Sequence, residues 1–127
     1  MTESKGYKDL KVYQLAYELA MKIFDATKSF PKEERYSLTD QIRRSSRSVA
    51  ANIAEAYRKR QYEKMFVSKI ADADAEAAET DVWLDFSRDC GYLAREMHNE
   101  LSAGYRDIGK MLGSMLMAPE KFAPIKR

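Results

Sequence analysis

The sequence predicts an all-α protein built as a four-helix bundle. Hydrophobic residues recur every three or four positions along four long stretches, short links join the stretches, and no stretch alternates as a half-buried strand does. Four helices with short links pack most simply in an up-down-up-down arrangement. A chain of 127 residues is the size of one domain. We therefore expect a flexible N-terminus (1–8), one bundle (9–118) and a C-terminal tail (119–127).

The first helix is expected over residues 10–29, with Asp9 as its cap. Pro31 ends it, because the residue before a proline is pushed out of helical geometry. The residues expected on its apolar face are Val12, Leu15, Ala16, Leu19, Ile23, Ala26 and Phe30, and Tyr13, Tyr17, Ala20 and Phe24 broaden that face.

The second helix, expected over residues 37–60, organises the chain. Ser37 and Asp40 stand at capping spacing, so the Ser37 hydroxyl is expected to accept from an early amide. Its apolar strip is Leu38, Ile42, Ser45, Val49, Ile53 and Ala56, and its polar strip is Gln41, Arg44, Ser48, Asn52, Glu55 and Lys59. A third side carries Arg43, Arg47 and Arg58 around Ala50, Ala51 and Ala54. A surface helix needs only one apolar strip, so contacts on more than one side are expected.

The third helix is expected over residues 62–89 and carries apolar residues on more than one side. The core line is Phe66, Ile70, Ala73, Ala77 and Leu84, and the second line is Ala71, Ala75, Ala78, Val82 and Phe86. Trp83 projects elsewhere again. A monomeric bundle needs only the core line, so the remaining apolar surface predicts an oligomer interface.

The fourth helix is expected over residues 93–117, after Cys90 and a left-handed Gly91 cap. Its inner side carries Met97, Leu101, Ile108, Met111, Leu112 and Met115. Gly104, Gly109 and Gly113 each cost about 1 kcal/mol relative to alanine. We expect another helix to approach closely there.

Composition and charge restrict the class of protein. The chain is 45% hydrophobic and 33% charged, and no apolar run approaches the ~18 residues of a membrane span. With one cysteine and no apolar signal core, we expect a cytoplasmic protein with no membrane partner. The net charge of +2 divides into +5 over residues 1–60 (13 Lys and Arg, 8 Asp and Glu) and −3 over residues 61–127 (9 against 12). The basic half indicates either a polyanion partner or basic helices packed beside acidic ones.

Several short motifs, taken in order, resemble one family. They are Tyr7, Asp9-Leu10 and Val12-Tyr13-Gln14; Phe30-Pro31, Glu34 and Tyr36-Ser37-Leu38; and Gln41-Ile42-Arg43-Arg44, Ser48-Val49 and Asn52-Ile53-Ala54-Glu55. Together they resemble the 23S rRNA intervening-sequence protein family, also called the four-helix bundle protein family, over nearly the whole chain. The sequence departs from that pattern at Ala56, where the family has glycine, and at Ala73-Asp74, where it has Gly-Ser.

The resemblance implies a left-handed up-down bundle that assembles as a ring-shaped homo-oligomer, commonly a pentamer. It also implies an association with ribosomal RNA genes by genomic position. The family is similar, further, to accessory proteins of diversity-generating retroelements, which bind nucleic acid and a reverse transcriptase.

The candidate nucleic-acid-binding residues put six positive charges on the second helix: Arg43, Arg44, Arg47, Arg58, Lys59 and Arg60. The alternative is a charged surface that pairs with the acidic third helix, within a subunit or between neighbours. The candidate oligomer interface consists of Gln41, Ser48, Asn52, Glu55, Val82, Trp83 and Phe86. Its polar strip fits a ligand groove, a solvated edge or an inter-subunit hydrogen-bond ladder, and we favour the ladder because partly buried polar groups need partners.

Enzymatic readings find little support. A di-iron bundle needs two Glu-x-x-His elements, but the single histidine, His98, follows Arg95 by three residues. Glu76 and Glu79 flank an apolar face as solvated carboxylates do, and a Cys90–His98 pair has no evident orienting partner. We expect no catalytic residue, cofactor, metal or small-molecule substrate. The sequence thus predicts a non-enzymatic, homo-oligomeric scaffold with RNA or DNA as the leading partner, or alternatively a protein-binding ring without nucleic acid.

Overall fold

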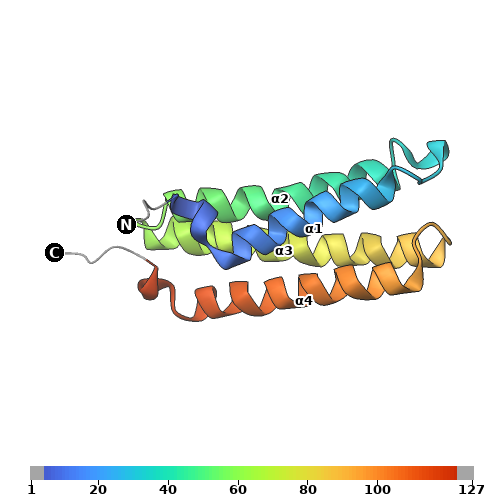
Figure 1. Ribbon diagram of the computed structural model, residues 1–127. Coiled ribbons are helices and arrows are strands. Elements are labelled where there is room, and N and C mark those ends of the chain that lie inside the picture. Colours follow the sequence, from blue (N-terminus) through green and yellow to red (C-terminus); the bar gives the residue numbers. More distant parts are fainter. Residues whose placement is uncertain (1–4, 123–127) are drawn as a thin grey trace.

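A computed structural model describes residues 5–122, and this part of the chain consists of helices without strands. The long helices are α1 (Lys11–Thr27), α2 (Leu38–Arg58), α3 (Glu63–Asp89) and α4 (Arg95–Met117). Three 3-10 helices accompany them: η1 (Gly6–Asp9), η2 (Lys32–Glu34) and η3 (Pro119–Lys121). The long helices lie side by side (Figure 1). The expected all-α class with four long helices is therefore confirmed for the described residues.

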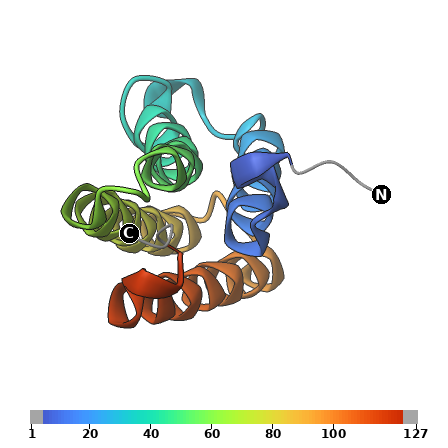
Figure 2. The same cartoon turned by 90° about the vertical axis from the view of Figure 1, so that its left-hand side faces the viewer.

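Seen end on, the four helices surround one core (Figure 2). Helix α1 contacts α2 and α4, and α3 contacts the same two helices. The α1–α2 and α3–α4 links lie at one end of the bundle, and the α2–α3 link lies at the other (Figure 1). Each short link therefore joins two helices that are neighbours in space.

The core forms largely where the sequence places it, although Met97 of α4, expected on the inner side, is exposed. The whole apolar strip of α2 is buried, and so is the core line of α3. Ile42, Ile53 and Ile70 are at most 1% exposed. Burying one such side chain contributes about 1.5–3 kcal/mol, which holds the four helices together.

Two expected helix caps are wrong in their chemistry. Leu10, not Asp9, is the N-cap of α1, and the Asp9 carboxylate instead accepts from the Lys5 amide at 2.8 Å. Ser37 does precede α2, but its hydroxyl donates to Glu34 Oε1 at 2.6 Å and caps no amide. The same Glu34 oxygen accepts from the Leu38 amide at 3.4 Å, so a carboxylate in the preceding turn does the capping.

Helix bounds differ slightly from those expected. Helix α1 ends at Thr27, two residues before the expected position 29, and α4 begins at Arg95 instead of residue 93. Residues 6–8, expected to belong to a flexible N-terminus, form part of the 3-10 helix η1, which begins at Gly6. Residues 1–4 and 123–127, expected to be flexible terminus and tail, lie outside the described residues.

Glycines mark one chain reversal and one close approach. Gly91 follows α3 with a φ of +80°, the left-handed conformation expected after a helix. At Gly104 an added Cβ would lie 2.7 Å from both methyl groups of Leu19 on α1, so the expected close approach is confirmed there. At Gly113 nothing lies within 4 Å, and at Gly109 only an Asp74 oxygen does, so the expectation is wrong at these two positions.

Among the described residues, no helix combines the length and the apolar character needed to cross a bilayer.

Candidate interaction surfaces

The α2–α3 seam holds three ion pairs between the two helices. Arg44 on α2 donates from Nη1 to Glu76 at 3.1 Å and from Nη2 to Glu79, both on α3. The Trp83 indole also donates to Glu79, at 3.1 Å. Desolvation lowers the pKa of Arg44, but the two carboxylates outweigh it, so the net shift is upward. Glu79 thus accepts hydrogen bonds from both Arg44 and Trp83 at this seam.

Three further residues of the polar strip, Ser48, Asn52 and Glu55, also find partners within one subunit. Glu55 pairs with Lys69 of α3 at 3.0 Å. Asn52 donates to the Ser48 carbonyl at 2.9 Å and lies 3.1 Å from its hydroxyl. As expected, Arg44 and Glu55 pair elsewhere and not with each other. The seam supports the interpretation that basic residues of α2 pair with α3 within the subunit, while an inter-subunit ladder stays a prediction.

The six candidate nucleic-acid-binding cations do not gather on one surface. Arg44 lies in the seam. Arg43 turns toward α1, where Nε donates to the Thr27 hydroxyl at 2.8 Å and the guanidinium lies 4.8 Å from the Phe24 ring centre. Arg47 is exposed and lies 5.8 Å from the same ring.

The other three cations lie at the end of the bundle that holds the α2–α3 link, and Lys59 and Arg60 belong to this link and not to the helix as expected, because α2 ends at Arg58. Arg60 stacks on the Tyr57 ring at 3.9 Å and donates to the Tyr57 carbonyl at 3.0 Å. Lys59 lines a shallow depression together with Lys64 of α3. We call Arg58, Lys59, Arg60 and Lys64 the basic end. Lys64 was not among the expected residues, because it lies beyond the second helix in sequence.

The second apolar line of α3 faces away from the core. All five residues of this outer stripe are exposed: Ala71, Ala75, Ala78, Val82 and Phe86. Val82 is 48% and Phe86 54% exposed, large fractions for such side chains. Trp83 is half-buried beside the stripe, with its ring centre 5.9 Å from that of Phe86. The expectation that this line is not used by the subunit's own core is confirmed.

A groove between α1 and α2 is the other open apolar surface. This tyrosine groove, of about 420 Å³, is lined by Tyr7, Tyr13, Tyr17, Ala20, Met21, Arg47, Ala50, Ala51 and Ala54. Tyr7 and Tyr13 meet edge to face at 5.0 Å. Burial and the neighbouring Tyr7 and Tyr17 raise the pKa of Tyr13, which keeps its hydroxyl neutral. The sequence predicted the tyrosines only as part of a broad apolar face, because spacing along one helix does not show which residues of another helix lie beside it.

His98 is held between α3 and α4 and is 5% exposed. Its Nε2 lies 2.8 Å from the Asp85 carboxylate and 3.4 Å from the Arg88 guanidinium, so the histidine does have an orienting partner that the sequence did not reveal. Cys90 is exposed and lines a different depression, with Trp83. The described residues therefore bring together no cysteine–histidine pair.

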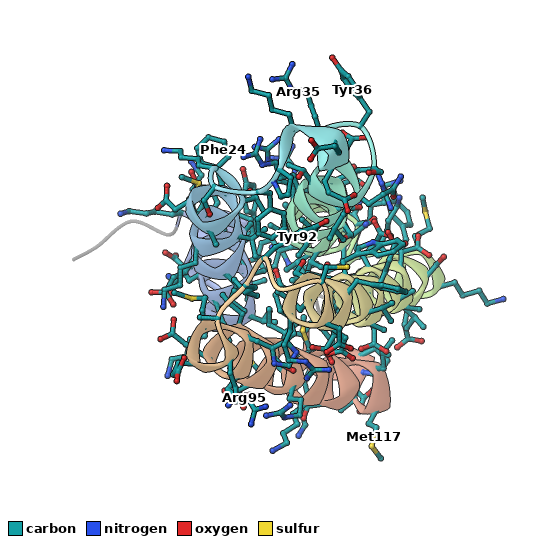
Figure 3. All side chains as sticks on the ribbon, turned by 90° about the vertical axis from the view of Figure 1, so that its right-hand side faces the viewer. Phe24, Arg35, Tyr36, Tyr92, Arg95 and Met117 are labelled. Carbon is teal, nitrogen blue, oxygen red and sulfur yellow. The ribbon has the colours of Figure 1, made fainter. Side chains whose placement is uncertain are left out.

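At the end with two links, Arg35 and Tyr36 project away from the bundle (Figure 3). The Tyr92 hydroxyl of the α3–α4 link donates to Glu34 at 3.0 Å and so joins the two links.

In residues 5–122 no group of three histidine, cysteine or carboxylate side chains is arranged to hold a metal ion.

These features define a class: an all-α helical-bundle protein. Its α2–α3 seam has ion pairs within the subunit, and its outer stripe and tyrosine groove expose apolar side chains. The model of the 23S rRNA-intervening sequence protein family matches residues 8–114. The chain is 31% identical in sequence to a protein of unknown function from the S23 ribosomal protein family of Bacteroides thetaiotaomicron, whose crystal structure is known. The two structures superpose with a TM-score of 0.76, and the match covers 84% of this chain and 95% of that chain. The comparison with curated proteins gives no match. The chain belongs to the 23S rRNA-intervening sequence protein family.

Proposed function

We propose that the protein is a non-enzymatic scaffold that assembles from several copies of its own chain. The subunit in this proposal is a left-handed up-down-up-down bundle, and the assembly is a ring, with five subunits as the number that the family resemblance favours. The observation that carries the proposal is the outer stripe of α3, whose exposed Val82 and Phe86 continue a line of exposed alanines.

The outer stripe supports self-association on physical grounds. Contiguous apolar surface on a small protein marks an interaction site, whereas single exposed apolar residues are ordinary. Alanines let another helix approach closely, and a larger apolar residue such as Phe86 then fills the space beside it. The polar seam, whose charges already have partners, leaves fewer unsatisfied groups to recruit a ligand.

Native mass spectrometry of the full chain, purified without nuclease, tests the proposal. Self-association gives a multiple of the 14.7 kDa subunit mass, and any bound nucleic acid adds mass in the same spectrum. Sedimentation velocity from low to high micromolar concentration checks that the multiple is not formed during ionisation. A single 14.7 kDa species throughout contradicts the scaffold.

A second candidate function is RNA or DNA binding at the basic end. Arg58, Lys59, Arg60 and Lys64 lie close together around one link, and no ion pair joins them to a carboxylate within the described residues. Lysine and arginine contacts with phosphates supply most sequence-independent affinity, and a ring repeats the basic end once per subunit. The alternative remains a protein-binding ring without nucleic acid.

Fluorescence anisotropy with structured RNA at several salt concentrations separates these two alternatives. Phosphate binding predicts affinity that falls steeply with salt and falls on the order of tenfold or more in a Lys59→Glu/Lys64→Glu variant. The matched control is Arg95→Glu/Lys110→Glu, which changes the net charge equally on exposed positions of α4. Equal losses in both variants point to net charge alone, and absence of binding at low salt favours the protein-binding ring.

A further inference from the structure

The outer stripe and the tyrosine groove are two different surfaces on one subunit. The stripe is a line of three alanines followed by Val82 and Phe86 on a single helix, whereas the groove is a hollow between α1 and α2. Alanines also form the floor of the groove, at positions 50, 51 and 54. A helix that presents alanines fits a groove floored by alanines, because neither side holds the backbones apart.

The charges beside the two surfaces are of opposite sign. Asp72 and Asp74 flank the outer stripe and make no ion pair within the described residues, although Asp72 is near enough to Lys69 to help raise the pKa of that lysine. Arg47 and Arg58 stand at the two ends of the alanine line on α2 and also have no carboxylate partner in residues 5–122. Charges left unpaired beside matching apolar surfaces favour one docking partner and disfavour others.

The heights of the two surfaces along the bundle also agree. Within the subunit Arg44 lies level with Glu76 and Glu79, and Glu55 lies level with Lys69. Ala51 falls between Arg44 and Glu55 on α2, so it lies level with the alanines between Lys69 and Glu76 on α3. Rotation about an axis along the bundle leaves heights unchanged, so in a ring the groove of one copy and the stripe of the next would lie at the same height.

We propose that the outer stripe of one copy docks into the tyrosine groove of the next copy of the same chain. This inference rests on the proposed scaffold and specifies its contact. Because the two surfaces differ, the contact is head to tail, and repetition closes a ring. Arg47 then lies beside one acidic flank of the neighbour's stripe, and Tyr17 and Met21 cover its alanines.

Two single substitutions break one surface each. Ala51→Glu places a carboxylate on the groove floor, and Ala75→Glu places one in the middle of the stripe. Both alanines are exposed in the subunit, so neither change disturbs the core, and glutamate is a good helix former. Ser114→Glu, on an exposed position of α4, is the control with the same charge change.

Each variant alone is expected to associate on the order of a hundredfold more weakly than the wild type and to sediment as a monomer, because a buried carboxylate without a partner opposes docking. Far-ultraviolet circular dichroism and dilute urea unfolding should match the wild type. An equimolar mixture, with one variant labelled with ¹⁵N, should form a complex of one labelled and one unlabelled chain and nothing larger. Each chain in that mixture keeps one intact surface, and the two intact surfaces are complementary.

The other outcomes are distinct. If the wild type stays monomeric, the proposed scaffold function is contradicted. If the wild type assembles and Ala51→Glu or Ala75→Glu assembles equally well, the scaffold proposal stands but the proposed contact is contradicted. Monomeric variants that do not combine indicate a symmetric contact and also overturn it. Loss of RNA binding in Ala51→Glu with assembly intact assigns the groove to nucleic acid and overturns it as well.

Discussion

Helix α3 has two flanks that differ in how completely one subunit uses them. Toward α2, Glu76 and Glu79 hold Arg44, and the Thr80 and Ser45 hydroxyls lie 2.8 Å apart in the interior. On the outer flank, the Val82 and Phe86 side chains are about half exposed and lie outside the core. On the flank toward α2, the polar side chains have hydrogen-bond partners within the subunit. On the outer flank, the apolar side chains are exposed to water.

This difference separates stability from association. Groups closed inside the subunit contribute to its folding free energy whether or not copies meet. Groups on the outer flank contribute little until another surface removes them from water. Substitutions on the two flanks of one helix should therefore affect different measurements.

The largest expected contrast is between two phenylalanines of α3. Phe66 is 1% exposed and Phe86 is 54% exposed. Phe66→Ala should lower the unfolding free energy by about 3–5 kcal/mol, because it leaves a cavity in the core. Phe86→Ala should change it by less than about 1 kcal/mol. Urea unfolding at the lowest usable concentration measures both, and similar losses would contradict the two-flank description.

A smaller contrast lies between two glycines of α4. Gly104→Ala must displace the methyl groups of Leu19, which is 3% exposed, and such overpacking costs about 1–3 kcal/mol. Gly113→Ala meets nothing within 4 Å and should raise stability by about 0.5–1 kcal/mol, since alanine is the better helix former. Thermal and urea unfolding of the pair test this, and equal effects would remove the case for a close approach at Gly104.

The seam itself should contribute modestly. The Arg44 side chain is 50% exposed, so water screens its ion pairs and Arg44→Ala should cost about 1 kcal/mol. Arg47→Ala, on the open side of the same helix, should cost less than about 0.5 kcal/mol in the dilute subunit. A double-mutant cycle of Arg44→Ala with Glu79→Gln measures the coupling, which should shrink at high salt. Additive losses would show that the contact stabilises nothing.

The smallest expected effect concerns Glu34 and pH. Hydrogen bonds from the Ser37 and Tyr92 hydroxyls lower the pKa of Glu34 below its ordinary 4.5. A depressed folded pKa gives stability that is complete above the unfolded pKa and disappears as pH falls through the folded pKa. The wild type should therefore keep its advantage over Glu34→Gln above the ordinary carboxyl pKa of 4.5 and lose it as the pH falls below that value. Glu33→Gln, whose side chain makes no hydrogen bond in the described residues, should show no such trend.

The fold was readable from the sequence because it depends on periodicity. Ile42, Val49 and Ile53 recur at helical spacing, and all three are buried. The outer stripe was readable for the same reason, since Val82 and Phe86 lie off the core line of α3. The caps were less accessible, because an Asp or Ser at capping spacing competes with other local partners, as Glu34 shows at Ser37.

The candidate sites were only partly readable. Six cations on one helix suggested one basic surface, but neighbouring helices decide which of them remain free. Arg43 and Arg44 differ by one position and point to different neighbours, one toward Thr27 and the other toward Glu76. A rotation of about 100° per residue around the helix separates adjacent side chains, so a run of like charges spreads around the rod.

The sequence by itself determined the helices, the buried strip of each, and an excess of apolar surface on α3, because these depend on spacing within one helix. Only the tertiary structure decided which charges are paired, that Leu19 fills the space at Gly104, and that tyrosines of α1 meet alanines of α2 in a groove. The physical reason is that pairing and grooves depend on the rotation and height of one helix relative to another, and periodicity along a single helix carries no information about either.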